Sequence, residues 1–191
     1  MKKVLAMVVL AIASLGAAAQ NSNIYVGGSI GFWHDSHDNS TNASTNHFVI
    51  LPEIGYNFNS SWALGAQLGY DYTHLCGQGI STNIFQFNPY LRYTYFRSSN
   101  NLISLFVDGA IGFGAGWTHY EDDDSKTAVT WNIGFRPGIS VNLSDNFSLV
   151  AHVGMLGYEG ANNAAKEAGY SNNGGLMLNG NNLTFGFYYT F

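Results

Sequence analysis

The sequence predicts an all-β protein whose strands close into a barrel with an apolar outer surface, and three observations support this prediction. Only 10% of the 191 residues are charged, whereas 46% are hydrophobic and 15% are aromatic. From Asn23 onward, large apolar residues alternate with glycine and small polar residues, which is the period of a β-strand. The links between these stretches are alternately short and long. Because a water-soluble domain carries about 25% charged residues, we expect the outside of this chain to face lipid.

The N-terminal segment, 1–19, is predicted to be a cleaved signal peptide that leaves 20–191 as the barrel domain. Lys2 and Lys3 precede a short apolar run, and Ala17-Ala18-Ala19 supplies the small residues of a cleavage site. A retained transmembrane helix is the alternative, but it needs about 20 apolar residues and would lack this site. No later segment approaches that length, so the strands must cross the membrane if anything does.

Eight stretches alternate at period two and are expected to be the strands. Those in the first half present large apolar residues as follows: Ile24, Val26, Ile30 and Phe32 in 23–34; Phe48, Ile50, Ile54, Tyr56 and Phe58 in 47–58; Trp62, Leu64, Leu68, Tyr70 and Tyr72 in 61–73; Phe85, Phe87, Leu91, Tyr93 and Tyr95 in 83–96. Glycine, Gln, Asn and a few charged residues occupy the opposite phase. One face of each strand is therefore apolar and the other is polar.

The second half repeats the pattern. Its apolar positions are Ile103, Leu105, Val107, Ile111, Phe113 and Trp117 in 102–117; Val129, Trp131, Ile133, Phe135, Ile139 and Val141 in 126–141; Phe147, Leu149, Val153 and Met155 in 147–157; Leu183, Phe185, Phe187, Tyr189 and Phe191 in 182–191. No charged residue falls on the apolar phase of any strand. Since Arg or Lys on the lipid side of a barrel costs about 2–4 kcal/mol at mid-depth, this distribution favours a lipid-facing exterior.

The connection lengths predict the topology. The links 59–60, 97–101 and 142–146 are short, whereas 35–46, 74–82, 118–125 and 158–181 are longer. Barrels of the bacterial outer membrane have short periplasmic turns, long extracellular loops and an even number of strands, and the sheet must close because lipid cannot pair free backbone groups. We therefore expect an eight-stranded antiparallel up-and-down transmembrane β-barrel with periplasmic termini and four extracellular loops.

Several segments carry a resemblance to a known family. They are Pro52-Glu53-Ile54-Gly55-Tyr56, Trp62-Ala63-Leu64-Gly65, Arg92-Tyr93-Thr94-Tyr95-Phe96, Arg136-Pro137-Gly138-Ile139 and Asp145-Asn146-Phe147-Ser148-Leu149. The chain resembles the small OmpA/OmpX-type outer-membrane barrels, sometimes loosely described as porin-like. The resemblance implies a bacterial outer-membrane location and a C-terminal signal, formed by Thr184, Gly186, Tyr189 and Phe191, that the barrel-assembly machinery reads.

The polar phase places charged residues inside the predicted barrel. Counted from the short turns, five of them lie at similar depth: Glu53, Arg92, Asp108, Arg136 and His152. Buried charges need partners, and the lumen of an eight-stranded barrel is just wide enough for side chains to fill. We expect an interior salt-bridge cluster that packs the lumen, with a gated ion path and a catalytic site as alternatives. Asp71 is expected nearer the outer rim, with His74.

No catalytic or cofactor site is expected. A lipid A deacylase would need a hydroxyl nucleophile beside a histidine on the outer wall, and an omptin-like protease would need a larger barrel, and neither pattern is visible. The barrel is therefore expected to have a structural or surface-interaction role, with a porin-like pore as the alternative and a lipid-modifying enzyme as a third.

The loops and the charge indicate few partners. Residues 20–191 hold five basic and twelve acidic residues, a formal charge of −7 that argues against nucleic acid. The acidic run 121–124 is expected to be a solvated tip, with divalent-cation bridging to lipopolysaccharide as the alternative. The segment 34–38 has metal-capable residues without an ordered spacing, and 158–181 is expected to be a flexible, exposed loop. Partners are then outer-membrane lipid, lipopolysaccharide, the assembly machinery and an unidentified surface ligand.

Overall fold

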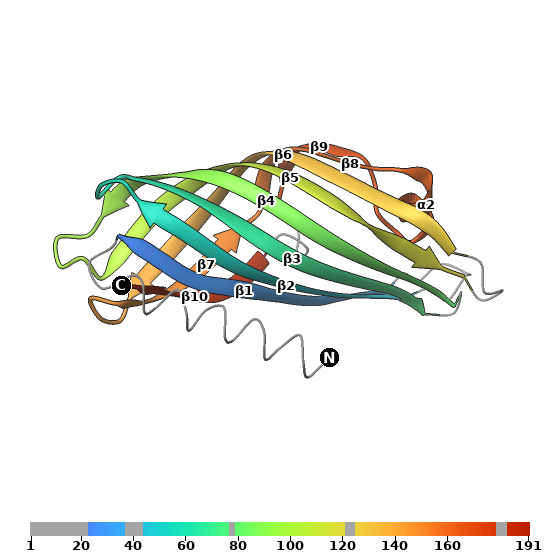
Figure 1. Cartoon of the computed structure of the whole chain (residues 1–191), viewed down its shortest axis with the longest axis horizontal. Helices are drawn as coiled ribbons and strands as arrows, with labels where there is room; N and C mark the ends of the chain where they lie inside the picture. The colour runs from blue at the N-terminus through green and yellow to red at the C-terminus, as the bar shows by residue number, and fades with distance from the viewer. Residues whose placement is uncertain (1–22, 37–43, 77–78, 121–124, 179–182) are drawn as a thin grey trace.

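The computed structural model describes residues 23–36, 44–76, 79–120, 125–178 and 183–191. The predicted signal peptide, most of the first loop and the acidic run 121–124 lie outside these residues. The strands run as long, tilted ribbons around a common axis (Figure 1). In order the elements are β1 (Ile24–Ser36), β2 (Ser44–Asn57), β3 (Trp62–Cys76), β4 (Ile80–Arg97), β5 (Ile103–His119), β6 (Ser125–Asn142), β7 (Phe147–Val153), β8 (Met155–Ala161), α2 (Asn163–Glu167), β9 (Asn173–Met177) and β10 (Leu183–Thr190).

The ladders form a closed ring. Each strand from β1 to β6 pairs antiparallel with the next, β7 pairs with β6, and β10 pairs with both β7 and β1. Strand β8 continues along β6 beyond β7, and β9 pairs with β8. The pairs β7–β8 and β9–β10 thus act as the seventh and eighth strands, each interrupted once. The predicted fold, an eight-stranded antiparallel barrel, is confirmed.

The segment after Gly154 differs from the sequence prediction. Gly154 has a φ of 74°, and this left-handed residue interrupts the alternation between β7 and β8. Met155, predicted to face lipid, is consequently 4% exposed, whereas Leu156 points outward. The predicted loop 158–181 holds the end of β8, the helix α2 and the strand β9. Because these elements are short and rich in glycine and asparagine, period-two alternation did not reveal them.

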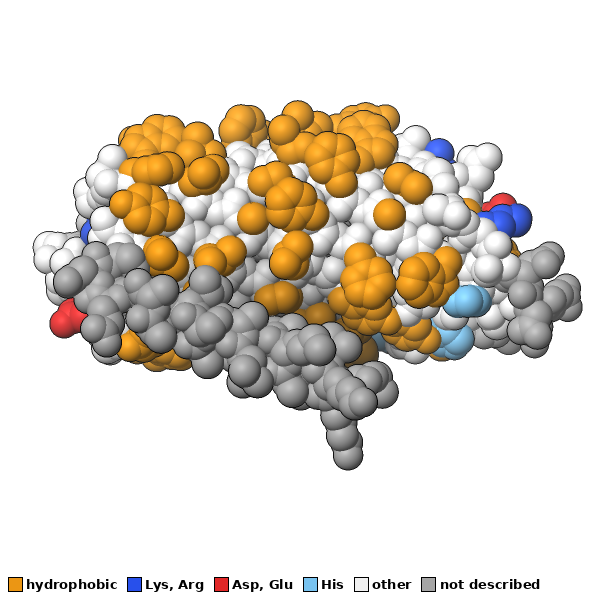
Figure 2. Space-filling view, in the orientation of Figure 1, with side chains coloured by type: hydrophobic (Ala, Val, Ile, Leu, Met, Phe, Trp, Pro, Cys, Tyr) orange, Lys and Arg blue, Asp and Glu red, His pale blue; other side chains and the backbone are white. Residues whose placement is uncertain are grey.

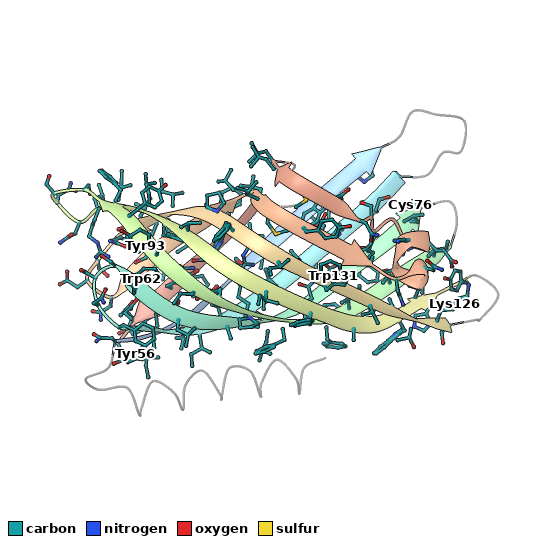
Figure 3. All side chains as sticks on the ribbon, turned by 90° about the horizontal axis from the view of Figure 1, so that it is seen from above. Tyr56, Trp62, Cys76, Tyr93, Lys126 and Trp131 are labelled. Carbon is teal, nitrogen blue, oxygen red and sulfur yellow. The ribbon has the colours of Figure 1, made fainter. Side chains whose placement is uncertain are left out.

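The outer surface is apolar between the ends of the barrel (Figure 2). Large side chains project from it, among them Phe32, Leu68 and Phe113, each at least 60% exposed. Aromatic pairs lie near both ends, as outer-membrane barrels place them at the two lipid–water interfaces. Trp62–Tyr93, Tyr56–Phe58 and Tyr189–Phe191 lie near the short links and the end of β10, and Trp131–Tyr158 lies toward the other end. Figure 3 labels Tyr56, Trp62, Tyr93 and Trp131. Among the described residues, no helix is long and apolar enough to cross a membrane.

Candidate functional site: the barrel lumen

The half of the lumen nearer the short links, called the inner half below, is filled around the buried guanidinium of Arg92; the half nearer α2 is called the outer half. The Arg92 guanidinium binds Asp108 through two parallel hydrogen bonds, from Nε to Oδ1 at 2.7 Å and from NH2 to Oδ2 at 2.8 Å. Its NH2 also donates to the Tyr188 hydroxyl at 2.9 Å and lies 3.6 Å from Glu53 Oε1. Arg92 in β4 and Asp108 in β5 are direct cross-strand partners. The strand register therefore brings the two side chains together.

The two carboxylates have further partners. His152 Nε2 lies 3.0 Å from Asp108 Oδ2, so Asp108 contacts both an arginine and a histidine. Glu53 accepts hydrogen bonds from Gln67 Nε2 at 2.8 Å and from the Tyr90 hydroxyl. Both acids are almost completely buried. Each buried charge is therefore compensated, as an interior with low dielectric requires.

Four aromatic rings enclose the Arg92 guanidinium. Its central carbon lies 4.0 Å from the Phe106 ring centroid, 5.1 Å from those of Tyr90 and Tyr188, and 5.8 Å from that of Tyr25. All four rings are at least 90% buried. These cation–π contacts and the ion pairs pack the buried side chains of the inner half against one another. We name this group, with Glu53, Asp108 and His152, the inner plug.

Sequence reasoning missed the aromatic part of the inner plug. Tyr90 lies two residues from Arg92, and Phe106 lies two residues from Asp108. In a strand, such positions share a face. The two-residue spacing from an inward-facing charged residue was thus the signal that could have placed Tyr90 and Phe106 in the lumen. The expectation that aromatic residues face lipid hid this signal.

Arg136 lies beside the plug without joining it. Its NH1 donates to Gln67 Oε1 at 2.9 Å, and Gln67 in turn donates to Glu53. The Nε and NH2 atoms of Arg136 are buried and have no hydrogen-bond partner in the described structure. Of the five residues predicted at one depth, Glu53, Arg92, Asp108 and His152 are in contact, and Arg136 reaches them only through the Gln67 amide.

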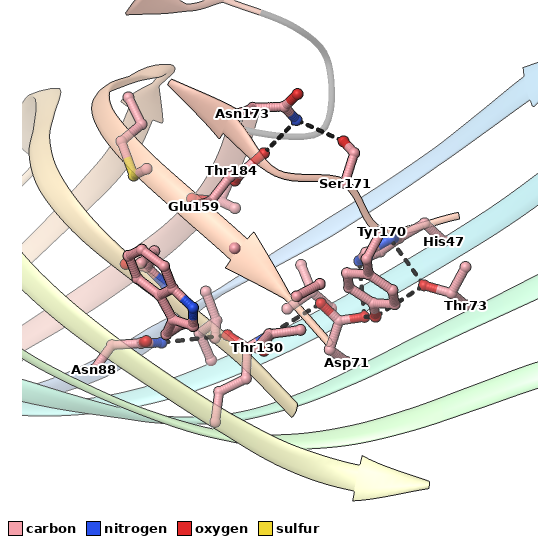
Figure 4. A pocket seen from close by; sticks show the side chains of 18 of the residues that line it. His47, Asp71, Thr73, Asn88, Thr130, Glu159, Tyr170, Ser171, Asn173 and Thr184 are labelled. Atoms are coloured by element: carbon pink, nitrogen blue, oxygen red, sulfur yellow. Dashed lines mark hydrogen bonds and ion pairs between the residues drawn. The ribbon is translucent and has the colours of Figure 1, made fainter. Parts of the chain in front are cut away.

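A second polar cluster lies toward the outer end, around Asp71 (Figure 4). Asp71 Oδ1 lies 3.0 Å from His47 Nε2 and accepts from the Tyr170 hydroxyl at 2.6 Å, while Oδ2 accepts from Gln86 Nε2 at 2.9 Å. The expected partner, His74, is not among these contacts. Residues three apart in a strand point to opposite faces, and His74 instead stacks near Tyr72.

This second cluster around Asp71, called the outer cluster, contains a hydroxyl, an imidazole and a carboxylate that contact one another in a row. Thr73 Oγ1 lies 3.1 Å from His47 Nδ1, and His47 Nε2 lies 3.0 Å from Asp71 Oδ1. Nucleophilic catalysis needs the hydroxyl to donate to the imidazole. Thr73 instead donates to the Tyr170 hydroxyl at 3.0 Å, and its side chain is buried. The arrangement thus holds Tyr170 in the lumen and does not present an activated nucleophile.

A cavity of about 380 Å³ lies in the outer half of the lumen, between the inner plug and the segment after β8. One part of its wall, from β1, β2 and the start of β8, is apolar: Trp33, Val49, Leu51 and Met155. Another, from β3, β4 and β6, is polar: Gln67, Gln86, Asn88, Asn132 and Arg136. The cavity is thus amphipathic, and its size is at the lower end of that of ligand pockets.

The helix α2 lies at the outer end of the barrel (Figure 1). The Asn162 side chain caps it by accepting from the Ala165 backbone N–H at 3.1 Å. The Thr118 hydroxyl donates to the Ala164 carbonyl at 3.0 Å, and Ala165 is fully buried against Ile84 and Ala128. The helix is therefore packed onto the strands.

An exposed contact supports the end of α2. Tyr120 donates a hydrogen bond to Glu167, and Lys126 Nζ lies 3.3 Å from the same carboxylate. The hydrogen bond from Tyr120, followed by the interaction with Lys126, lowers the pKa of Glu167. The contact joins the residue after β5, the start of β6 and α2.

No group of three or more His, Cys, Asp or Glu side chains placed to hold a metal ion occurs among the described residues. His34 uses its Nδ1 to contact Asn46 Oδ1 at 2.7 Å. Asp35 and Ser36 pair with Thr45 and Ser44 in the β1–β2 ladder, whereas His37, Asp38 and the acidic run 121–124 fall outside the described part of the chain.

A closed barrel of eight antiparallel strands, apolar outside and charged within, defines the class of transmembrane β-barrels found in the bacterial outer membrane. Residues 4–191 match the family model of the outer membrane protein beta-barrel domain. The chain belongs to this family, which confirms the resemblance inferred from the sequence. A search of curated proteins finds no match.

Two crystal structures show the same fold. Neisserial surface protein A is 15% identical, with a TM-score of 0.54 over 89% of this chain and 98% of the other. The N-terminal β-barrel domain of OprF from Pseudomonas aeruginosa is 13% identical, with a TM-score of 0.51 over 90% of this chain and all of the other. At this identity the likeness concerns the fold, and the family points to the bacterial outer membrane as the location.

Proposed function

We propose that this protein is a non-conducting, non-enzymatic barrel with a structural or surface-interaction role, which holds its four longer connections at the cell surface. The observation that carries the proposal is the inner plug. Arg92 with its two carboxylates and four aromatic rings occupies the inner lumen, where a pore would need continuous water. The charges within it are paired with each other, which suits packing better than ion transport.

The orientation belongs to the same proposal. Short links join β2 to β3, β4 to β5 and β6 to β7, and these links lie at the end that also holds both ends of the described barrel (Figure 1). Short turns and termini are periplasmic in bacterial outer-membrane barrels. The helix α2 and the outer cluster then lie on the extracellular side, where lipopolysaccharide and a surface ligand are the proposed partners.

Conductance tests the proposal directly. The refolded barrel in a planar lipid bilayer is expected to give no steady single-channel current, because the inner plug leaves no continuous aqueous path. Rare, brief openings are compatible with this expectation. A steady, large current in most insertions would overturn it and favour the porin-like alternative.

The C-terminal residues are proposed to direct assembly. The Phe191 backbone N–H donates to the Ile24 carbonyl at 3.0 Å, and its ring contacts Tyr189 with a centroid distance of 4.9 Å. We expect deletion of Phe191 to lower the amount of barrel in the outer membrane several-fold, measured by quantitative immunoblotting of membrane fractions. The matched control is Phe185→Ala, which removes a lipid-facing ring from the same strand and leaves the terminus intact.

The two variants separate assembly from lipid contact. Refolding into detergent in vitro should be nearly unaffected by the deletion, because the assembly machinery takes no part there. Equal membrane yields for the wild type and the deletion, or equal losses for both variants, would contradict the assembly role.

A further inference from the structure

We propose that the outer-half cavity binds an amphipathic anion with a single acyl chain, whose head group pairs with Arg136 and whose chain lies along the apolar wall. The first observation is that the two arginines of the lumen differ in their carboxylate partners. Arg92 has Asp108 and Glu53 as partners, whereas Arg136 has no carboxylate within 4.0 Å among the described residues. Its Nε and NH2 atoms also lack a protein acceptor.

An anion is the group that Arg136 lacks. Arg136 is partly buried, and buried charged atoms without a partner are costly. A guanidinium is shaped to bind a carboxylate or phosphate with two parallel hydrogen bonds. The carboxylates that line the same cavity are already in use: Asp71 contacts His47, Tyr170 and Gln86, and Glu159 accepts from Asn173 at 2.9 Å. Among the described residues of the cavity wall, no free carboxylate is therefore left to pair with Arg136.

The apolar part of the cavity wall indicates the rest of the ligand. Val49 and Leu51 from β2 and Met155 from β8 are each less than 10% exposed and line the cavity together with Trp33. Trp33 stacks on His47 at a centroid distance of 3.9 Å. A small inorganic anion would leave this apolar wall without a partner, whereas an acyl chain would bury apolar surface against it. The cavity thus matches a molecule with one anionic end and one apolar chain.

Described residues bound the cavity at both of its ends. His152 of the inner plug lines it on one side, and Tyr170, which follows α2, lines it on the other.

Equilibrium binding to the refolded full chain in phosphatidylcholine nanodiscs tests the proposal. Radiolabelled laurate is expected to bind the wild type saturably, with one molecule per barrel above the partition into empty nanodiscs. Arg136→Gln should weaken binding about tenfold or more, as loss of a charge-assisted pair predicts. The matched control Arg97→Gln, at an exposed arginine near a short turn, should leave it unchanged. Uncharged dodecanol should show no saturable component.

Competition by dodecyl phosphate distinguishes the head group. If dodecyl phosphate displaces laurate, the site accepts anionic head groups in general. If it does not, the site is specific for carboxylates. Both results support the proposal. Binding that equals the partition into empty nanodiscs, or that is equal in wild type and Arg136→Gln, would overturn it.

A measurement on the wild-type chain keeps the test valid if Arg136→Gln does not fold. With the methionine methyl groups labelled with ¹³C, laurate should shift the Met155 resonance saturably, and dodecanol at the same concentration should not. The resonance is assigned with Met155→Leu. No shift with laurate, or the same shift with both compounds, would contradict a head-group-dependent site.

Discussion

Replacing Asp108 by Ala is expected to lower the free energy of unfolding by about 3–5 kcal/mol, which is the usual cost of removing one partner of a buried ion pair. Asp108 is fully buried and contacts both Arg92 and His152. Its removal leaves the guanidinium of Arg92 with Glu53 at 3.6 Å as the nearest carboxylate. The destabilisation thus comes mainly from a buried charge that has lost its hydrogen-bonded partner.

Urea unfolding of the barrel in lipid vesicles, followed by tryptophan fluorescence, measures this change. Asp145→Ala, in the exposed turn between β6 and β7, is the control and should change the stability by less than about 0.5 kcal/mol. The triple variant Arg92→Met, Asp108→Leu and Glu53→Gln should recover much of the loss, because it removes Glu53, the second carboxylate near Arg92, as a charge as well, and well-packed uncharged residues can replace a buried ion pair. A single variant as stable as the control would contradict the central role of this pair.

The fold was predictable because lipid imposes a strict pattern on a barrel. Every strand must present apolar residues outward at period two, and the sheet must close. This pattern holds in β5, where Ile111 and Phe113 face outward and Asp108 faces inward. The same regularity placed the charged residues of the lumen on one face before their contacts were known.

The contacts within the lumen were less predictable, because they depend on the register and tilt of the strands. His47 and Asp71 lie on β2 and β3, and their pairing requires knowing which residues of the two strands are opposite, since Val49 is the direct partner of Asp71. The contact of Tyr170 with Asp71 spans 99 positions in the sequence. It depends on α2 and β9, which are too short to produce a periodic signal, and on the break at Gly154.

The second large effect is expected at the closing ladder of the barrel. Gly186 of β10 pairs with Ser29 of β1 and with Val150 of β7. A Cβ atom at this position would lie 2.1 Å from the Gly28 carbonyl oxygen and 2.8 Å from Ser29 Cα. Both are backbone atoms, so a neighbouring side-chain rotation cannot relieve the overlap. A branched residue at 186 would therefore force β1 and β10 apart.

Gly186→Val is accordingly expected to abolish the folded, closed barrel. An open sheet edge in lipid leaves backbone groups unpaired, at several kcal/mol for each group, and the β1–β10 ladder is the one that closes the ring. Folding is measured by the heat-modifiable mobility of the protein in gel electrophoresis and by circular dichroism in vesicles. The matched control is Thr184→Val, which puts the same side chain two residues away on the same face of β10, at a position that already has a branched side chain. If Gly186→Val folds with the yield and stability of Thr184→Val, the close approach of β1 and β10 is not required for closure. If Gly186→Val fails to fold and Thr184→Val folds, Gly186 is needed for the close approach of β1 and β10 that closes the barrel. This role is separate from any recognition of Tyr189 and Phe191 during assembly.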